Sequence, residues 1–172
     1  MRSFYLTLTL LIGLFAIKGT FWSQTELQEV HEFLSKNKTT LSSSYSNEDL
    51  LNGVVPTICF RNGDYVPSSN EENAIRLITD VNSIESIEDQ PQLATVKVLW
   101  LQLNLQESVD NKKIQRILNM VPNTEVIYLY FTYAPCVSSN NEAQCNLDHL
   151  RKTVDVSLLR DQRVLYTYSQ EE

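Results

Sequence analysis

The chain has 172 residues and a formal net charge of −7 at pH 7. A net negative charge repels nucleic acid and anionic membrane surfaces, so neither is an expected partner. With 42% hydrophobic residues, the chain is long and apolar enough to bury the core of one domain.

Residues 1–23 have the parts of a secretory signal peptide. Arg2 gives a short positive start, and residues 6–17 (LTLTLLIGLFAI) form an apolar run that ends at Lys18. This run is shorter than the roughly 20 residues that a membrane-spanning helix needs. The segment therefore predicts export from the cytoplasm.

We expect cleavage after Ser23, and we place the first mature residue between Thr20 and Gln24. Cleavage after Gly19 and an uncleaved signal anchor are the alternatives. Removal of residues 1–23 takes away two basic residues and no acidic one, so the net charge changes from −7 to −9. After cleavage we expect no membrane span, and a secreted or periplasmic location.

The remaining chain is divided into two parts, residues 24–50 and residues 51–172. In the first part, residues 25–34 (TELQEVHEFL) predict a short amphipathic helix. Residues 35–49 are rich in Ser, Asn and Thr and predict a polar linker, which holds a glycosylation sequon at Asn37. The second part is expected to be a single α/β domain.

Export changes the interpretation of the three cysteines, because an oxidising compartment favours disulfides. Cys136 and Cys145 flank the polar loop VSSNNEAQ, so we expect a bond between them. Cys59 lies in the apolar stretch VVPTICF and is expected to be a buried free thiol.

Strand and helix patterns alternate after residue 50. Asn62-Gly63 predicts a tight turn between strands at 54–60 and 65–66. Further strands are predicted at 75–78, 96–103, 126–131, 153–158 and 164–168. Helices are predicted at 110–121, with Asp110 as its cap, and at 141–150. Strands that alternate with helices predict a parallel sheet with helices on one face.

The spacing of the strands is regular. Apolar pairs recur at Ile75 and Leu77, Leu99 and Leu101, Ile127 and Leu129, and Val154 and Val156, with intervals of 24, 28 and 27 residues. Asp80, Asn104 and Thr132 occupy matching positions after three of these strands.

This pattern resembles the leucine-rich repeat, L-x-x-L-x-L-x-x-N, over about residues 72–158. The resemblance implies a short solenoid, in which the residue at the Asn position hydrogen-bonds the turning backbone. The alternative is a general α/β sheet whose crossover units are similar in length.

Three aromatic residues are the candidate binding site. Trp100, Tyr128 and Tyr130 alternate with the leucine positions of their strands, so they face the opposite side of the sheet. Exposed Trp and Tyr side chains are typical anchors of protein interfaces. We therefore predict an exported, non-enzymatic module that binds a protein or peptide partner. The alternative is that both faces are buried and these residues belong to the core.

A small exported enzyme of the hydrolase type is the alternative function. Cys145 and His149 lie four residues apart and would share a helix face, as a thiol nucleophile and its base require. The same two residues with Cys136 would also suit zinc, but we expect the disulfide instead. The carboxylates form no recognisable pair, so no catalytic residue, metal or cofactor is assigned.

Overall fold

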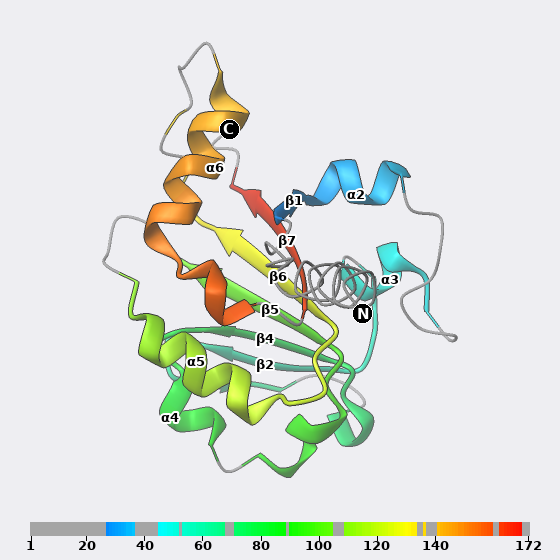
Figure 1. Cartoon of the computed structure of the whole chain (residues 1–172). Helices are drawn as coiled ribbons and strands as arrows, with labels where there is room; N and C mark the ends of the chain where they lie inside the picture. The colour runs from blue at the N-terminus through cyan, green and yellow to red at the C-terminus, as the bar shows by residue number, and fades with distance from the viewer. Residues whose placement is uncertain are drawn as a thin grey trace, which may run out of the picture.

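The molecule is built on a mixed β-sheet (Figure 1). The computed structural model describes residues 27–36, 45–51, 53–67, 71–88, 90–104, 109–133, 136, 141–159 and 162–169. The predicted signal peptide, Thr25 and the sequon at Asn37 lie outside these residues. The strands are β1 (Leu27–Glu29), β2 (Thr57–Arg61), β3 (Asp64–Val66), β4 (Arg76–Asp80), β5 (Val98–Leu103), β6 (Val126–Phe131) and β7 (Arg163–Tyr168).

The described strands form one seven-stranded sheet in the order β1-β7-β6-β5-β4-β2-β3. Neighbouring strands run parallel except β2 and β3, which form the predicted hairpin. The φ angles of Asn62 and Gly63 are 53° and 86°, and two positive values are what a tight type I′ turn requires.

The described helices are α2 (Val30–Lys36), α3 (Asn47–Leu51), α4 (Ile84–Ile87), α5 (Asn111–Met120) and α6 (Glu142–Thr153). Three short 3-10 turns, η1 (Glu71–Asn73), η2 (Pro91–Thr95) and η3 (Val156–Leu159), lie between them and the strands. No described helix is both long enough and apolar enough to cross a bilayer.

Helices cover both faces of the sheet. In Figure 1, α4, α5 and α6 lie on one side and α2 and α3 on the other. The prediction of helices on one face is therefore wrong. The second layer comes from the N-terminal part of the chain, for which the sequence predicts a helix and a polar linker. The apolar residues of that part pack on the sheet: Val30, Phe33, Leu50 and Leu51 contact the cluster of Val98, Val126, Tyr128 and Leu165.

The face under α4, α5 and α6 holds the larger core. The inward residues of β5 and β6 are fully buried, and Ile114 and Ile117 of α5 belong to the same cluster. This set confirms the predicted core: Leu99, Leu101, Leu103, Ile127 and Leu129. Asp110 accepts a hydrogen bond from the Lys112 backbone N–H at 2.9 Å, which confirms the predicted cap of α5.

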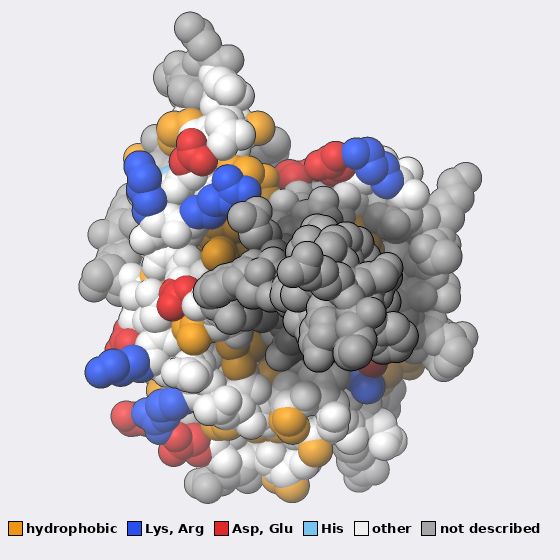
Figure 2. All heavy atoms as spheres, in the orientation of Figure 1, with side chains coloured by type: hydrophobic (Ala, Val, Ile, Leu, Met, Phe, Trp, Pro, Cys, Tyr) orange, Lys and Arg blue, Asp and Glu red, His pale blue; other side chains and the backbone are white. Residues whose placement is uncertain are grey.

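The outer surfaces of the helices are charged. Figure 2 shows basic and acidic side chains interspersed over α5 and α6. Arg116 of α5 forms an ion pair with Glu88, which follows α4. The mixture of signs is typical of a solvated surface.

The sheet register confirms one predicted interval and corrects another. Leu99 pairs with Ile127, as the 28-residue interval predicts. Upstream, however, Leu99 pairs with Leu77 rather than Ile75, so the interval is two residues shorter than predicted.

The predicted strand at 153–158 is wrong, and β7 takes its place in the sheet. Helix α6 continues to Thr153, and the Asp155 carboxylate accepts from the Ser157 backbone N–H. Such local hydrogen bonds compete with strand pairing. The structure is therefore an α/β fold with a mostly parallel sheet and does not show a solenoid.

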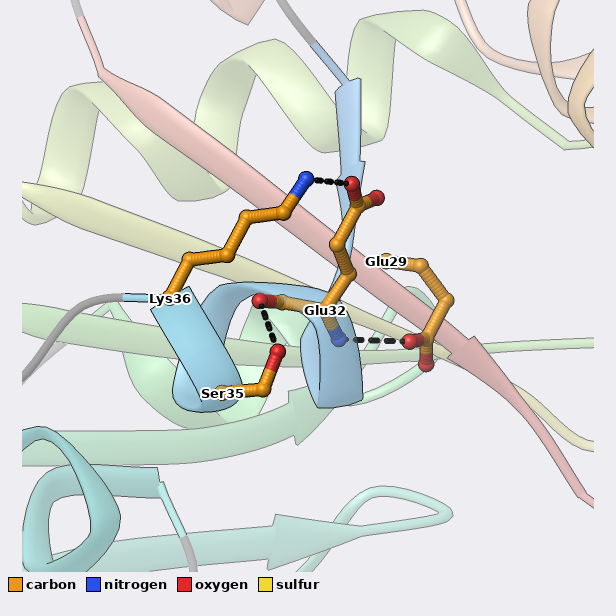
Figure 3. A network of polar contacts seen from close by, with 4 residues as sticks. All are labelled: Glu29, Glu32, Ser35 and Lys36. Atoms are coloured by element: carbon orange, nitrogen blue, oxygen red, sulfur yellow. Dashed lines mark hydrogen bonds and ion pairs between the residues drawn. The ribbon is translucent and has the colours of Figure 1, made fainter.

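The first predicted helix begins later than expected. Residues Leu27–Glu29 form strand β1, which pairs with β7, and the helix α2 starts at Val30. The Glu29 carboxylate accepts from the Glu32 backbone N–H at 3.0 Å, and Glu32 forms an ion pair with Lys36 (Figure 3). Glu29 thus ends the strand and caps the helix, because its side chain takes one of the unpaired N–H groups of the first turn.

Candidate functional site

The three predicted binding residues lie together on the sheet. Trp100 pairs in register with Tyr128, and Tyr130 follows two residues later on the same face. The Trp100 ring centroid is 4.5 Å from that of Tyr128, edge to face, and 6.1 Å from that of Tyr130. All three face away from Leu99 and Leu101, as the alternation predicts. We call Trp100, Tyr128 and Tyr130 the aromatic cluster.

Exposure divides the aromatic cluster. Tyr128 is only 4% exposed, because α2 and α3 pack over the amino-terminal half of the strands. Trp100, level with Tyr128 on the neighbouring strand, and Tyr130, two residues nearer the carboxyl end of β6, are both half-buried. Burial raises the pKa of Tyr128 to about 12, so its hydroxyl is neutral at physiological pH. Tyr128 is therefore a packing residue, whereas Trp100 and Tyr130 present ring surface to the outside.

A buried cation supports the cluster from the other side. Arg76 is 8% exposed, and its guanidinium carbon lies 5.9 Å from the centroid of the Trp100 ring. It donates to the backbone carbonyls of Leu50, Leu51 and Gly53 at 3.0–3.3 Å, and its Nε donates to Thr57 Oγ1 at 3.2 Å. Burial lowers the pKa of Arg76.

These carbonyls belong to the end of α3 and the residues after it. The guanidinium therefore satisfies acceptors that have no partner inside the helix, and it places a positive charge at the negative end of the helix dipole. Arg76 thus ties α3 to the sheet beside Trp100.

A cleft of about 420 Å³ opens where the parallel strands end. It is lined by Arg61, Asn62, Asp80, Val81, Asn82, Gln102, Leu103, Asn104, Val109 and Thr132. Open α/β sheets bind ligands outside the carboxyl ends of their strands. The cleft adjoins the aromatic cluster through Gln102, which follows Trp100 on the same face and pairs in register with Tyr130.

Asp80 is the structural centre of the cleft. Its carboxylate accepts from the backbone N–H groups of Asn62, Asn82 and Ser83 at 2.7–3.0 Å, and from Ser83 Oγ at 3.0 Å. Four bonds use the acceptor capacity of a carboxylate, so Asp80 serves the loops rather than acid–base chemistry.

The cysteines follow the sequence prediction. Cys136 and Cys145 are disulfide-bonded with a Cα–Cα distance of 6.0 Å, and Cys59 is free and buried. Burial raises the pKa of the Cys59 thiol. A bonded Cys145 has no thiolate, so the alternative pairing of Cys145 with His149 lacks its nucleophile, and a zinc site lacks two ligands. Within the described ranges, no group of three or more His, Cys, Asp or Glu side chains could hold a metal.

Sequence reasoning missed Arg76 and the cleft. A lone arginine in the strand IRLITD gives no signal of its own, because its partners are backbone carbonyls more than 20 residues earlier. The cleft did leave a signal. Asp80, Asn104 and Thr132, which the sequence pattern aligns with one another, all line it, although the register places Asp80 level with Gln102 rather than with Asn104.

We compared the chain with family models, with curated proteins and with solved structures, and none of the three comparisons gave a match.

Proposed function

We propose that this chain is an exported, non-enzymatic binding module that holds a protein or peptide partner on the half-buried rings of Trp100 and Tyr130. The observation that carries the proposal is the arrangement of these rings. They lie on adjacent parallel strands of one sheet face, and both are half-buried: Trp100 packs against the margin of the cluster under α2 and α3, and Tyr130 lies two residues further along its strand than the buried Tyr128. Large aromatic rings that are partly covered and partly accessible are typical anchors of interfaces.

The rigidity of the surface supports the proposal. Both rings stand on central strands, and Trp100 is held between the Tyr128 ring and the Arg76 guanidinium. A binding surface on strands loses little conformational freedom when a partner arrives. Export is supported by the N-terminal segment and by the Cys136–Cys145 disulfide, a bond favoured outside the cytoplasm.

The binding test uses the chain that begins at Gln24, in which Trp100 is the only tryptophan. A library of displayed peptides is selected against this protein, and each selected peptide is titrated by Trp100 fluorescence. We expect the selected peptides to carry an apolar or aromatic residue and to bind Tyr130→Ala at least tenfold more weakly than the unsubstituted protein.

Tyr65→Ala is the matched control. Tyr65 is 43% exposed but lies on β3, at the far edge of the sheet, so its loss should leave peptide affinity unchanged. Equal affinity of the unsubstituted protein and Tyr130→Ala, or no peptide selected at all, would contradict the proposal.

Export is tested separately. The full chain is expressed with its N-terminal segment, and the protein recovered outside the cytoplasm is sequenced from its N-terminus. We expect a first residue between Thr20 and Gln24. A chain recovered there that still begins with Met1 would contradict cleavage.

A further inference from the structure

Hydrogen bonds join the two loops that line the cleft beside the aromatic cluster. Asp80 joins the turn of the β2–β3 hairpin to the loop after β4 through the Asn62 and Asn82 backbone N–H groups. The Gly63 backbone N–H donates to Ser83 Oγ at 3.0 Å, and Ser86 Oγ donates to the Gly63 carbonyl at 2.5 Å. These bonds hold the hairpin turn and the loop after β4 in place relative to each other, and such preorganisation lowers the entropic cost of binding.

The cleft is polar but balanced in charge. Among its described lining residues, Arg61 is the cation and Asp80 the carboxylate, and the Asp80 oxygens are already engaged. Four of the remaining side chains are carboxamides: Asn62, Asn82, Gln102 and Asn104. This composition favours a ligand that is neutral and polar over a strongly charged one.

Carboxamides match one ligand group closely. Each has a carbonyl acceptor and an NH₂ donor, the same pair that a peptide group presents along a main chain. A row of carboxamides can therefore bind an extended main chain without selecting its side chains. The volume of about 420 Å³ is within the range of sites that enclose a small ligand or a short segment.

The position of Gln102 connects the cleft to the aromatic cluster. Two residues along a strand span about 7 Å, and Gln102 is two residues from Trp100 on the same face. An extended peptide has nearly the same repeat. An apolar side chain placed over the Trp100 and Tyr130 rings would therefore bring the next main-chain groups of that peptide to Gln102.

From these features we infer that the cleft binds the main chain of an extended segment of the partner, through the carboxamides of Gln102 and Asn82, while a neighbouring apolar side chain of that segment lies on Trp100 and Tyr130. This inference rests on the proposed function and names how the same partner is held. In this arrangement, the Trp100 and Tyr130 rings select the side chain of the partner, and the cleft binds its main chain.

The test uses a peptide selected as above and a series of analogues, each with one N-methylated residue. Dissociation constants are measured for the unsubstituted protein, Gln102→Met and Asn82→Ala. Gln115→Met is the matched control, because Gln115 is an exposed carboxamide on α5, which packs on the opposite face. The Asn82 backbone N–H that bonds Asp80 remains in Asn82→Ala.

We expect N-methylation at one or two positions to weaken binding at least tenfold. Gln102→Met should weaken binding of the unmethylated peptide about tenfold. In this variant, N-methylation at one of these positions should weaken binding less than threefold. Gln115→Met should change neither value. This coupling between one side chain and one peptide N–H is the signature of a direct contact.

If Tyr130→Ala loses binding but Gln102→Met and Asn82→Ala bind as tightly as the unsubstituted protein, the inference falls and the proposed function stands. If none of these three variants changes the affinity for the peptide, both the inference and the proposed function are wrong. Displacement of the peptide by chitotriose, with that displacement lost in Gln102→Met, would identify a saccharide as the ligand of the cleft and overturn the inference.

Discussion

The guanidinium of Arg76 lies over the ring of Trp100, 5.9 Å from its centroid, while its N–H groups bond carbonyls at the end of α3. A cation over the face of a tryptophan is attractive, and more so where water is excluded. The contact couples the position of the proposed anchor ring to the packing of the N-terminal helices.

Replacement of Arg76 is expected to lower stability strongly. Arg76→Met leaves the buried carbonyl of Leu51 and the partly buried carbonyl of Gly53 without this donor, and the expected loss is about 2–4 kcal/mol of unfolding free energy. Arg76→Lys should recover only part of this lost stability, because a lysine ammonium cannot reproduce the planar set of N–H donors of the guanidinium. Urea unfolding measures both variants. If Arg76→Lys were as stable as the unsubstituted protein, the guanidinium geometry would not be needed to bond these carbonyls.

Leu101→Ala and Trp100→Ala should separate stability from binding. Leu101 is fully buried, so Leu101→Ala should cost about 2–5 kcal/mol. Trp100 is half-buried, so Trp100→Ala should cost less while weakening peptide binding. Unfolding and calorimetric binding of both variants provide the comparison. Equal losses of stability would mean that Trp100 is a core residue and that the open binding surface should be abandoned.

Asp80→Asn is expected to loosen the two loops of the cleft. An amide side chain keeps one acceptor oxygen and adds a donor, so it cannot accept from Asn62, Asn82 and Ser83 together. We expect a loss of about 1–3 kcal/mol and faster hydrogen exchange at these three backbone amides. Asp64→Asn, an exposed residue of the same hairpin, is the control. Unchanged exchange in Asp80→Asn would show that the carboxylate does not hold the loops.

Stability should fall at alkaline pH in part through Tyr128. Its pKa is raised by burial to about 12, against about 10 in the unfolded chain. Its contribution is therefore complete below pH 10 and is lost as the pH rises toward 12, because only the unfolded state releases the proton in that window. Tyr128 should account for a loss of about 2–3 kcal/mol in the free energy of unfolding. Urea unfolding from pH 9 to 11.5 should show a smaller decline in Tyr128→Phe; an identical decline would contradict the shift.

The Cys136–Cys145 disulfide is expected to add about 2–3 kcal/mol of stability through the short loop that it closes. The double variant Cys136→Ser and Cys145→Ser measures this loss in urea. Cys59 should react slowly with iodoacetamide until the protein unfolds, because it is buried and its pKa is raised. Non-reducing peptide mapping that joined Cys59 to another cysteine would refute the pairing.

The central sheet was predictable from sequence because its signals are local. Strand β6 has the predicted bounds, Asp110 caps α5 as expected, and Asn62-Gly63 forms the expected turn. Alternation along β5 also placed Trp100 and Leu101 on opposite faces. In each case, a few consecutive residues contain the whole signal.

The errors arose where distant residues decide the structure. The segment Leu27–Glu29 looks helical by its apolar spacing, yet pairing with β7 makes it a strand. Tyr128 and Trp100 have the same pattern in sequence, but the covering helices bury only Tyr128 nearly completely. The partners of Arg76 and Asp80 were invisible for the same reason, since each lies in another element of the fold.

The parallel pairing of β1 with β7 also bears on how the molecule assembles. Leu27, near the beginning of the described chain, is in register with Val164, near its end. Strands β5, β6 and β7 each lie beside the strand that precedes them in the chain, so they can dock in succession as synthesis proceeds, whereas β1 has no place in the sheet until β7 has arrived. Loop closure over such a distance is slow. Strand β1 should therefore join the sheet last, after β7 has emerged, whereas α3 can already dock on β4 through Arg76.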